Sequence, residues 1–393
     1  MRILVGITGG IAAYKAVGVV RILVEAGHDV KVIPTANALR FVGAATLEAI
    51  SKNTVDPDLY TDVADVKHVE LGQSADLIIV APATASFIAR TAAGLGDDLL
   101  SSSILASRAP ILVAPAMHTE MWENPSTVAN VATLRARGIN VLEPAVGRLT
   151  GVDSGKGRLP EPEQIVEAAL NLFVPQDLVG MKVLITAGGT REPIDSVRFI
   201  GNNSSGLMGF ALYKAAKSRG ADVRLIAANL EAGLTEGQVD VSTTEELRAA
   251  LAELAPTTDV LIMAAAVSDY RIENPSTSKL KKADLGATPT INLVENPDLL
   301  AEVAAHRTLS SNQILVGFAA ETLAGEELSA SARKKLRSKN VDLIVANDVS
   351  DGAVFGREST SIKLVTENTE SSFDGTKLEA ANAILNWVAA SRN

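Results

Sequence analysis

The sequence predicts an α/β fold made of two doubly wound, mainly parallel sheets, one in each half of the chain. Three observations lead to this prediction. The 393 residues exceed the length that one hydrophobic core usually serves. One opening pattern occurs twice, as MRILVGITGG from residue 1 and as MKVLITAGGT from residue 181. Short apolar runs alternate with helical stretches in both halves, which is typical of right-handed βαβ units.

The strands of the first half are predicted from four short apolar runs, MRILVGIT, DVKVIPT, ADLIIVAPAT and APILVAPAM. Between the first two runs we expect a helix from about Ile11 to Ala26, because Gly27 then acts as a helix stop signal. The runs end in polar or glycine-bearing turns. In open α/β sheets, ligands bind at such carboxyl ends of parallel strands.

The second half repeats this organisation with the runs MKVLITAGG, ADVRLIAAN, TDVLIMAAAV, QILVGFAAE and VDLIVAND. Residues 268–294 break the pattern, and we expect a loop or hairpin there, inserted over the ligand crevice. Pro175 and Gly180 mark a short connection between the halves. The predicted domains are therefore 1–172 and 181–393, joined by a linker over 173–180.

Composition and charge exclude several classes of protein. The net charge of -10 argues against a binder of nucleic acid, which needs a broad basic face. The sequence contains no cysteine, which excludes disulfides, thiolate metal sites and a cysteine nucleophile. The N-terminal apolar run is too short for a membrane span and lacks a signal-peptide cleavage site, so we expect a cytoplasmic protein with no membrane partner.

The first glycine turn, GITGGIAAYK, is a candidate phosphate site. Thr8, Gly9 and Gly10 stand where a strand meets the N-terminus of a helix, whose free amides and dipole favour an anion. The alternative is that the glycines only close an α/β turn. The order is not G-x-G-x-x-G, so a dinucleotide fingerprint does not follow.

Three further stretches, KHVELGQSADLIIVAPATASFIA, PAMHTEMW and GRLTGVDSGKGRLPEP, follow this turn. Together the four resemble the flavin-dependent cysteine decarboxylases, specifically phosphopantothenoylcysteine decarboxylase, over roughly residues 1–170. The resemblance implies a flavodoxin-like, Rossmann-like domain that binds FMN. The implied contacts are Gly9, Gly10 and Ile11 for the phosphate, Thr35, Thr84, Ala85, Ser86 and Phe87 elsewhere, and Ala116 beside the ring.

In that family the flavin oxidises the substrate thiol to a thioaldehyde, which acts as an electron sink while carbon dioxide leaves. The enethiolate that forms is then reprotonated and reduced. His68 matches the family's active-site histidine and would act as a base or hydrogen-bond partner. The alternative for His68 is an ordinary surface histidine near the start of a strand.

Two departures from the family pattern bear on the decarboxylase. PAMHTEMW has His118 where an asparagine normally holds the substrate carboxylate; imidazole is also able to donate to a carboxylate. The flap stretch GRLTGVDSGKGRL lacks the cysteine that serves as acid in the reductive step. Either Asp153, His118 or a bound water donates that proton, or the decarboxylase half is impaired.

The second half contains TAGGTREPIDSVRFIGNNSSGLMGFAL, AAAVSDYR, SKLKK, VENPDLL, VGFAAET and RKKLRSKNVDLIVAND. These stretches resemble phosphopantothenate-cysteine ligase over roughly residues 181–390. The resemblance implies activation of a carboxylate by CTP, with pyrophosphate release, to an acyl-cytidylate from which the amine of cysteine displaces CMP. Lysines and Mg²⁺ are the expected means of stabilising the charge on the phosphates, and the sequence does not identify the metal ligands.

Residue types in these stretches suit a phosphorylated ligand. Arg198 and Asn202 offer side-chain donors, and Lys335 and Lys339 stand four apart on one predicted helix face. The alternative for RKKLRSK is a basic solvated helix. The resemblance adds Asn202 as a contact to the acyl-cytidylate and Lys279 as the first lysine of K-x-K-K. It further implies CTP and substrate contacts from Arg198, Ala264, Ala265, Asp269, Lys281, Lys282, Asp298, Leu299, Phe318, Lys335 and Lys339.

The two resemblances together predict a bifunctional enzyme of coenzyme A biosynthesis. It would couple 4'-phosphopantothenate to L-cysteine and decarboxylate the product to 4'-phosphopantetheine. Two alternatives stay open, an active ligase with a degenerate decarboxylase half and a flavin-binding regulatory protein. A flavin oxidoreductase using NAD(P)H is disfavoured by the AGGTREP turn and by Asn229 at the end of the next strand. The families imply a homo-oligomer, with trimeric flavin domains and dimeric ligase domains.

Overall fold

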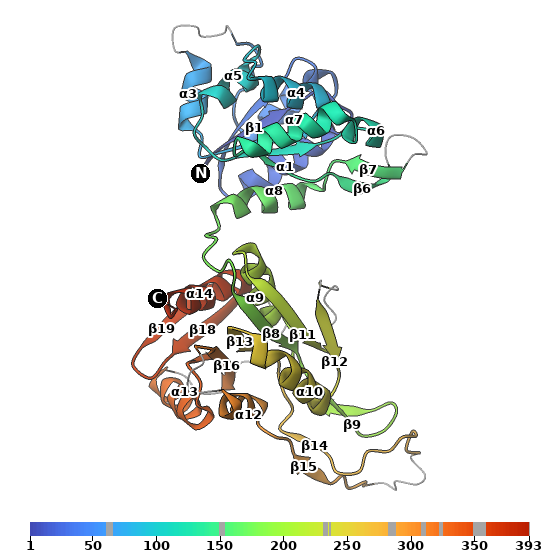
Figure 1. The fold of residues 1–393 in the computed structure, drawn as a ribbon, viewed down its shortest axis with the longest axis vertical. Coiled ribbons are helices and arrows are strands. Elements are labelled where there is room, and N and C mark those ends of the chain that lie inside the picture. Colours follow the sequence, from blue (N-terminus) through green and yellow to red (C-terminus); the bar gives the residue numbers. More distant parts are fainter. Residues whose placement is uncertain are drawn as a thin grey trace. The chain divides into compact units, whose positions relative to one another are not determined.

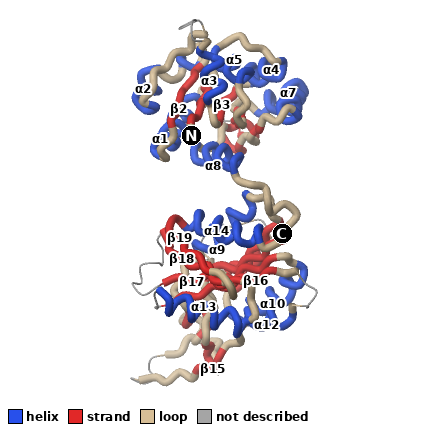
Figure 2. The backbone as a smooth tube through the Cα atoms, turned by 90° about the vertical axis from the view of Figure 1, so that its left-hand side faces the viewer, coloured by secondary structure: helices blue, strands red, loops and turns tan. Residues whose placement is uncertain are grey.

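The computed structural model divides the chain into two compact units, Met1–Val174 and Pro175–Asn393. Figures 1 and 2 show both units as layered α/β structures. The structure describes residues 1–59, 66–148, 154–230, 235, 237–281, 288–307, 312–321, 325–348 and 359–392. Within these residues no helix has the length and apolar character needed to cross a membrane.

The first unit contains a five-stranded parallel sheet with the strand order β2-β1-β3-β4-β5. Its strands are β1 (Arg2–Ile7), β2 (Asp29–Pro34), β3 (Leu77–Ala83), β4 (Ile111–Pro115) and β5 (Asn140–Val141). The first four coincide with the predicted runs, so the doubly wound sheet is confirmed. An antiparallel hairpin of β6 (Ala145–Arg148) and β7 (Ser154–Arg158) follows.

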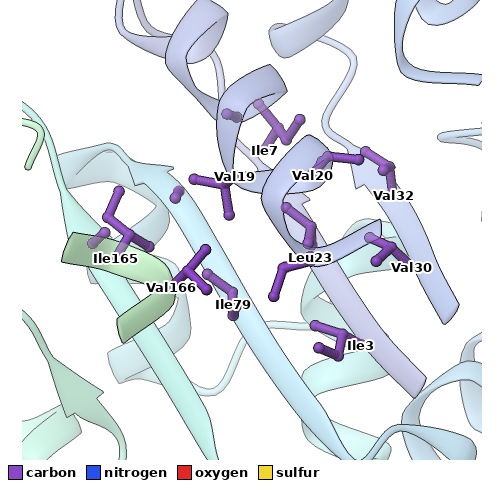
Figure 3. Packing of buried hydrophobic residues seen from close by; sticks show 14 of the residues in the cluster. Ile3, Ile7, Val19, Val20, Leu23, Val30, Val32, Ile79, Ile165 and Val166 are labelled. Atoms are coloured by element: carbon purple, nitrogen blue, oxygen red, sulfur yellow. The ribbon is translucent and has the colours of Figure 1, made fainter. Parts of the chain in front are cut away.

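Helices cover both faces of this sheet because its strands are apolar on both sides. The helices are α1 (Ala13–Glu25), α2 (Ala44–Ser51), α3 (Lys67–Ser74), α4 (Ala85–Ala93), α5 (Leu99–Ala106), α6 (Thr119–Trp122), α7 (Pro125–Ala136) and α8 (Pro162–Leu170), with 3-10 turns η1 (Ala38–Arg40) and η3 (Asn171–Phe173). Ile3 and Ile79 of the strands belong to one buried cluster with Val19 of α1 and Ile165 of α8, and Figure 3 shows these residues. The opposite face, with Ile78, packs on α4, α5 and α7.

The second unit has an eight-stranded sheet with the order β12-β11-β8-β13-β16-β17-β18-β19. Neighbours from β12 to β17 pair in parallel, and β18 and β19 add an antiparallel edge. The strands are β8 (Lys182–Gly188), β11 (Asp222–Ala228), β12 (Gln238–Val241), β13 (Val260–Met263), β16 (Ile314–Glu321), β17 (Leu343–Asp348), β18 (Ser359–Val365) and β19 (Glu370–Thr376). Five of these were predicted; β12 and the antiparallel edge were not.

The faces of the second sheet are covered by different helices. Helices α9 (Leu207–Ser218) and α14 (Lys377–Ala390) pack on one face. On the other face lie α10 (Thr244–Leu254), which the 3-10 turn η4 (Ala255–Thr257) extends, α12 (Leu299–His306) and α13 (Gly325–Lys339). The two layers of helices are visible above and below the red strands in Figure 2.

Two hairpins extend from this unit. One pairs β9 (Arg191–Pro193) with β10 (Phe199–Gly201), and the other pairs β14 (Tyr270–Ile272) with β15 (Leu293–Glu295). The second hairpin confirms the break in the βα pattern over 268–294, of which residues 282–287 lie outside the described part.

The residues expected to form the end of the linker pack into the second unit. Leu178 is fully buried there. Arg219 is 1% exposed, and its Nε and Nη2 atoms donate to the two carboxylate oxygens of Asp177 at 2.8 and 2.6 Å. Its Nη1 donates to Asn386 Oδ1 of α14 at 2.8 Å. One guanidinium therefore joins the start of the unit to its last helix.

We predict that Arg219→Leu lowers the free energy of unfolding of the second unit by about 2 kcal/mol, because Arg219 is buried and makes charge-assisted hydrogen bonds, while its partner Asp177 is partly exposed. Urea unfolding followed by Trp387 fluorescence, in a Trp122→Phe background, reports on this unit alone because the chain has two tryptophans. Arg224→Leu, at an exposed position of β11, is the control. Equal unfolding midpoints for the two variants would contradict the role given to Arg219.

Candidate functional site

The first candidate site is the turn after β1. Thr8 is buried, its hydroxyl donates to Pro82 O at 2.8 Å, and it accepts from the N–H of Thr84 at 3.0 Å. A Cβ on Gly9 would lie 2.4 Å from Asn37 Cβ, so only glycine fits there. The loops after β1, β2 and β3 are thus held together at one edge of the sheet.

Two further residues predicted to contact FMN, Thr35 after β2 and Ala116 after β4, lie at the same edge. The N–H of Thr35 donates to Ile7 O at 2.9 Å, and the N–H of Ala116 donates to Ala83 O at 3.1 Å. The structure therefore brings the loops of four predicted FMN segments together.

The backbone of this edge fits an anionic ligand. Within the described part of the chain, the N–H groups of Gly9, Gly10 and Ile11 donate to no protein acceptor. Thr84 caps α4 by accepting from Phe87 N, at 3.4 Å, and the N–H groups before Phe87 have no intrahelical partner. The Phe87 side chain is 1% exposed and belongs to the core, so this residue offers backbone to a ligand. Two helix starts thus present donors suited to a phosphate.

The hairpin β6–β7 covers the loop after β4. A Cβ on Gly155 would lie 2.3 Å from Thr119 Oγ1, and one on Gly157 would lie 2.2 Å from Met117 O, so both glycines permit this close crossing. His118 occupies the N-cap position of α6 and is exposed, without a side-chain capping bond. Asp153 lies outside the described residues.

His68 lies elsewhere in the first unit. It belongs to α3, which packs against α5 where Gly72 approaches Ser103 O. Its side chain is half-buried and forms no hydrogen bond or ion pair with any residue that the structure describes. Figure 1 places α3 and α6 on opposite sides of the unit, so the helices of His68 and His118 are not adjacent within one chain.

The second candidate site is a cavity of about 620 Å³ at the carboxyl edge of the second sheet. Its walls come from the start of α9, the loop after β13, the start of α12, the end of β16, and helices α13 and α14. Nine predicted residues line it: Asn202, Ala264, Ala265, Asp269, Asp298, Leu299, Phe318, Lys335 and Lys339. The structure thus gathers residues that are up to 137 positions apart, from 202 to 339.

The start of α9 opens into this cavity. Gly206 has a φ of +69° at the N-cap, and a Cβ there would lie 2.2 Å from Leu230 Cδ1. A Cβ on Gly209 would lie 2.4 Å from Ala187 Cβ, so glycine lets the helix approach β8 closely. No side chain caps this helix. Its first N–H groups therefore remain available for an anion.

The lysines of α13 are paired with carboxylates at the cavity wall. Lys335 Nζ lies 2.7 Å from Glu321 Oε1, and this hydrogen bond lowers the pKa of the Glu321 carboxyl. Lys339 Nζ lies 2.9 Å from Asp298 Oδ2. Both ion pairs are partly exposed and weak enough to be exchanged for a more highly charged ligand.

Arg198 does not line the cavity. Its Nε and Nη2 atoms donate to Asp195 Oδ2 at 3.0 and 2.5 Å, and Nη2 also donates to Leu280 O at 3.1 Å. Asp195 Oδ2 accepts from the N–H of Leu280 at 3.1 Å. Arg198 holds the pKa of the Asp195 carboxyl well below its usual range. The pair therefore fastens the segment that carries Lys279 and Lys281.

The two described lysines of this segment, Lys279 and Lys281, do not line the cavity. Lys279 and Lys281 are exposed, and Lys282 lies outside the described residues. Asn202 is fixed on the wall by its Nδ2, which donates to Val267 O at 2.9 Å.

Sequence reasoning missed a buried polar network below the cavity. The hydroxyl of Thr244 donates to Glu192 Oε1 at 2.7 Å, and the N–H of Ser268 donates to Thr190 Oγ1 at 2.9 Å. Asn296 Nδ2 donates to Ser268 O at 2.9 Å. All five residues are less than 10% exposed. The spacing of these five residues along the chain follows no helix or strand period. The polar residues in TREP and VENP are the only feature of the sequence that indicates part of this network.

The cavity wall also includes residues that were not predicted for the site: Asn347 at the end of β17, Thr360 and Ile362 of β18, and Lys377 of α14. Nowhere in the described ranges do three His, Cys, Asp or Glu side chains form a group suited to a metal ion.

The chain is similar to known proteins over almost its whole length. Residues 1–173 match the family model described as Flavoprotein, and residues 178–391 match the DNA/pantothenate metabolism flavoprotein C-terminal domain. A Mycobacterium bovis protein named coenzyme A biosynthesis bifunctional protein CoaBC is 53% identical, with 98% of this chain and 96% of that protein covered. Its namesake in Vibrio cholerae is 43% identical, with 98% and 97% covered. The solved C-terminal domain of a CoaBC protein is 32% identical at a TM-score of 0.45, covering 55% of this chain and 97% of its own.

We predict that Asp195→Asn loosens the lysine segment, because the amide lacks the charge that holds Arg198. Cleavage by trypsin after Lys279 or Lys281, located by peptide mass, should become about tenfold faster, as expected for losing one charge-assisted hydrogen bond. Asp222→Asn, an exposed carboxyl at the start of β11, is the control. Unchanged cleavage in Asp195→Asn would show that another contact holds the segment.

Proposed function

We propose the function from one premise: the chain belongs to the family of bifunctional coenzyme A biosynthesis proteins, as both family models and the full-length relatives show. The second unit couples 4'-phosphopantothenate to L-cysteine with CTP. The first unit decarboxylates the resulting 4'-phosphopantothenoyl-cysteine to 4'-phosphopantetheine with FMN. The observation that supports this division best is that each unit has its own glycine turn and helix start with free amides at a sheet edge.

The ligase step joins two anions and therefore needs cations. The carboxylate of 4'-phosphopantothenate attacks the α-phosphorus of CTP, pyrophosphate leaves, and the amine of cysteine displaces CMP from the acyl-cytidylate. Asn202, fixed through Val267 O, contacts the acyl-cytidylate with its remaining amide groups. Lys335 and Lys339 exchange their carboxylate partners for phosphate oxygens, a favourable exchange because phosphate is more highly charged.

The other proposed nucleotide contacts lie on the same cavity wall. Asp269 and the backbone of Ala264 and Ala265 contact the nucleotide, while Phe318, at the end of β16, packs near the base or ribose. Arg198 acts through Asp195 by positioning the segment of Lys279, Lys281 and Lys282. Mg²⁺ enters with CTP and is held mainly by its phosphates and water.

In the first unit the N–H groups of Gly9, Gly10 and Ile11 hold the phosphate of FMN, and the starts of α1 and α4 favour its charge. Thr35, the turn from Thr84 to Phe87 and Ala116 border the rest of the cofactor. When bound, FMN supplies a two-electron oxidation of the substrate thiol and returns the electrons after carbon dioxide has left. His118 holds the substrate carboxylate, and His68 acts as a base or hydrogen-bond partner.

We also propose that the protein is a homo-oligomer with trimeric flavin units and dimeric ligase units. The separation of α3 and α6 supports this, because His68 and His118 then meet at one flavin only if two copies contribute. The cytoplasmic location remains a prediction of the sequence.

A second candidate function is an active ligase beside a degenerate decarboxylase. The observation that favours it is the absence of cysteine from the flap stretch, and from the chain as a whole. The two candidates differ only in whether carbon dioxide is released.

We predict that Asn202→Ala or Lys279→Gln slows CTP-dependent coupling by about 100-fold or more, the scale for losing a group that stabilises a transition state. Pyrophosphate release measures coupling. The visible flavin spectrum should stay unchanged in both variants, because the sites lie in separate units.

The reciprocal variant is Gly9→Val. Its side chain collides with Asn37, so flavin should be lost while CTP-dependent coupling continues. Loss of flavin in Asn202→Ala, or loss of coupling in Gly9→Val, would show that the activities are assigned to the wrong units.

We further predict that one of two variants, Asp153→Asn or His118→Asn, slows formation of the saturated product by about 100-fold or more, the scale for a lost acid. Asp153 is the first choice because it lies in the flap stretch that normally carries the cysteine. Mass analysis after a single turnover should reveal a species two hydrogens short of the product. If both variants turn over like the parent, the proton comes from water and Asp153 has no catalytic role.

A further inference from the structure

The cavity of the second unit contains a lysine that the proposed mechanism does not use. Lys377 is the first residue of α14, directly after β19. Since β18 is antiparallel to both β17 and β19, the strands β17 and β19 end at the same edge of the sheet. Helix α14 begins at this edge, so its first residue, Lys377, lines the cavity together with Asn347 and Thr360.

Lys377 approaches the cavity from the opposite face to the lysines of α13. Leu328 and Leu336 of α13 belong to the core on one face of the sheet, whereas Ile384 of α14 belongs to the core on the other. Figure 2 likewise separates α13 from α14 by the strands. Lysines from two helices therefore flank the ends of β16 and β17, where Phe318 and Asn347 line the cavity.

Three described lysines line the cavity, and they differ in their partners. Lys335 pairs with Glu321, and Lys339 pairs with Asp298. Lys377 has no hydrogen bond or ion pair with any part of the chain that the structure describes. Its side chain is half-buried, and burial lowers the pKa of its ammonium. No described residue thus compensates the charge of Lys377.

The fold gives no reason for a lysine at this position. A cation in the first turn of a helix opposes the helix dipole. The start of α14 is already fixed by a capping box, in which Thr376 Oγ1 accepts from Glu379 N at 3.3 Å and Glu379 Oε2 accepts from Thr376 N at 2.9 Å. The capping box fixes the backbone of Lys377, while its ammonium stands at an unfavourable position for a cation, as is common for residues selected for binding instead of stability.

We propose that Lys377 is a third phosphate-binding lysine of this cavity, contacting the phosphate chain of CTP from the α14 side, opposite Lys335 and Lys339. This inference rests on the proposed ligase function. Because Lys377 has no carboxylate to release, its contact with phosphate is gained without breaking an ion pair. It would add a nucleotide contact beside the antiparallel edge that β18 and β19 form.

The test measures binding of CTP and of cytidine, which lacks phosphate, to the full chain by titration calorimetry. Lys377→Met removes the charge and keeps the length of the side chain. It should weaken CTP binding by about 10- to 100-fold, the range for one hydrogen bond to a charged group, and leave cytidine binding unchanged. Lys377→Arg should bind CTP more tightly than Lys377→Met. Lys334→Met, on an exposed position of α13, is the control with the same change in charge.

A second readout separates binding from a structural role. Without nucleotide, Lys377→Met should melt at the same temperature as the parent or higher, because the buried charge is removed. A lower melting temperature with equal loss of cytidine and CTP binding would overturn the proposal in favour of a structural role. Normal CTP binding in Lys377→Met, alongside weakened binding in Lys335→Met, would overturn it and leave the CTP site intact. A parent chain that binds no CTP would overturn the proposed ligase function itself.

Discussion

Parallel strand pairing is the constraint on which both candidate sites depend. In the second unit, β8 pairs in parallel with β13, and β13 with β16, so the carboxyl ends of these strands lie at one edge. Side-chain and backbone bonds then tie the loops that follow. The N–H of Ala265 donates to Thr186 Oγ1 at 3.1 Å, and the N–H of Thr190 donates to Ala266 O at 3.1 Å. In the first unit Thr8 has the same function, joining the ends of β1 and β3. The sites are composed of loops, but the sheets determine where those loops meet.

Charge is distributed differently over the two sides of the ligase cavity. Lys335 and Lys339 of α13 form ion pairs with Glu321 and Asp298. These ion pairs are partly exposed and therefore contribute little to stability. Such pairs order the lysines, and we propose that phosphate replaces their carboxylate partners. Lys377 has no partner among the described residues, and in our proposal the binding of phosphate offsets the cost of its burial. Among the described residues, the cavity wall thus has two lysines in ion pairs and one lysine without a partner.

Much of the architecture follows from the sequence because buried parallel strands are continuous apolar runs, as in LIIVAPA of β3 and VLIM of β13. Strand β19, ESSFDGT, could not be predicted this way. It lies at the edge of the sheet, is mostly exposed and contains residues disfavoured in strands, so its pairing depends on β18 instead of its own composition. Lys377 was missed for the same reason, since it reaches the cavity only through this edge.

Residues of the candidate site could be predicted from the sequence where their motifs follow parallel strands, because the ends of such strands meet at one edge of the sheet. Phe318 and Lys335 line the cavity as the motifs implied. Arg198 was expected to face a phosphate and instead pairs with Asp195, three residues before it in the chain. No periodicity encodes that choice, which depends on how the β9–β10 hairpin folds back on Leu280.

The central claim, that one chain carries out both steps, is tested most directly by the ratio of two products. The full chain is incubated with 4'-phosphopantothenate, L-cysteine and CTP, and released pyrophosphate and carbon dioxide are quantified together. Each coupling releases one pyrophosphate, and each decarboxylation one carbon dioxide. We predict equal amounts at completion, with 4'-phosphopantetheine as the product. Pyrophosphate without carbon dioxide would contradict the claim and show that the flavin unit does not work without the missing thiol.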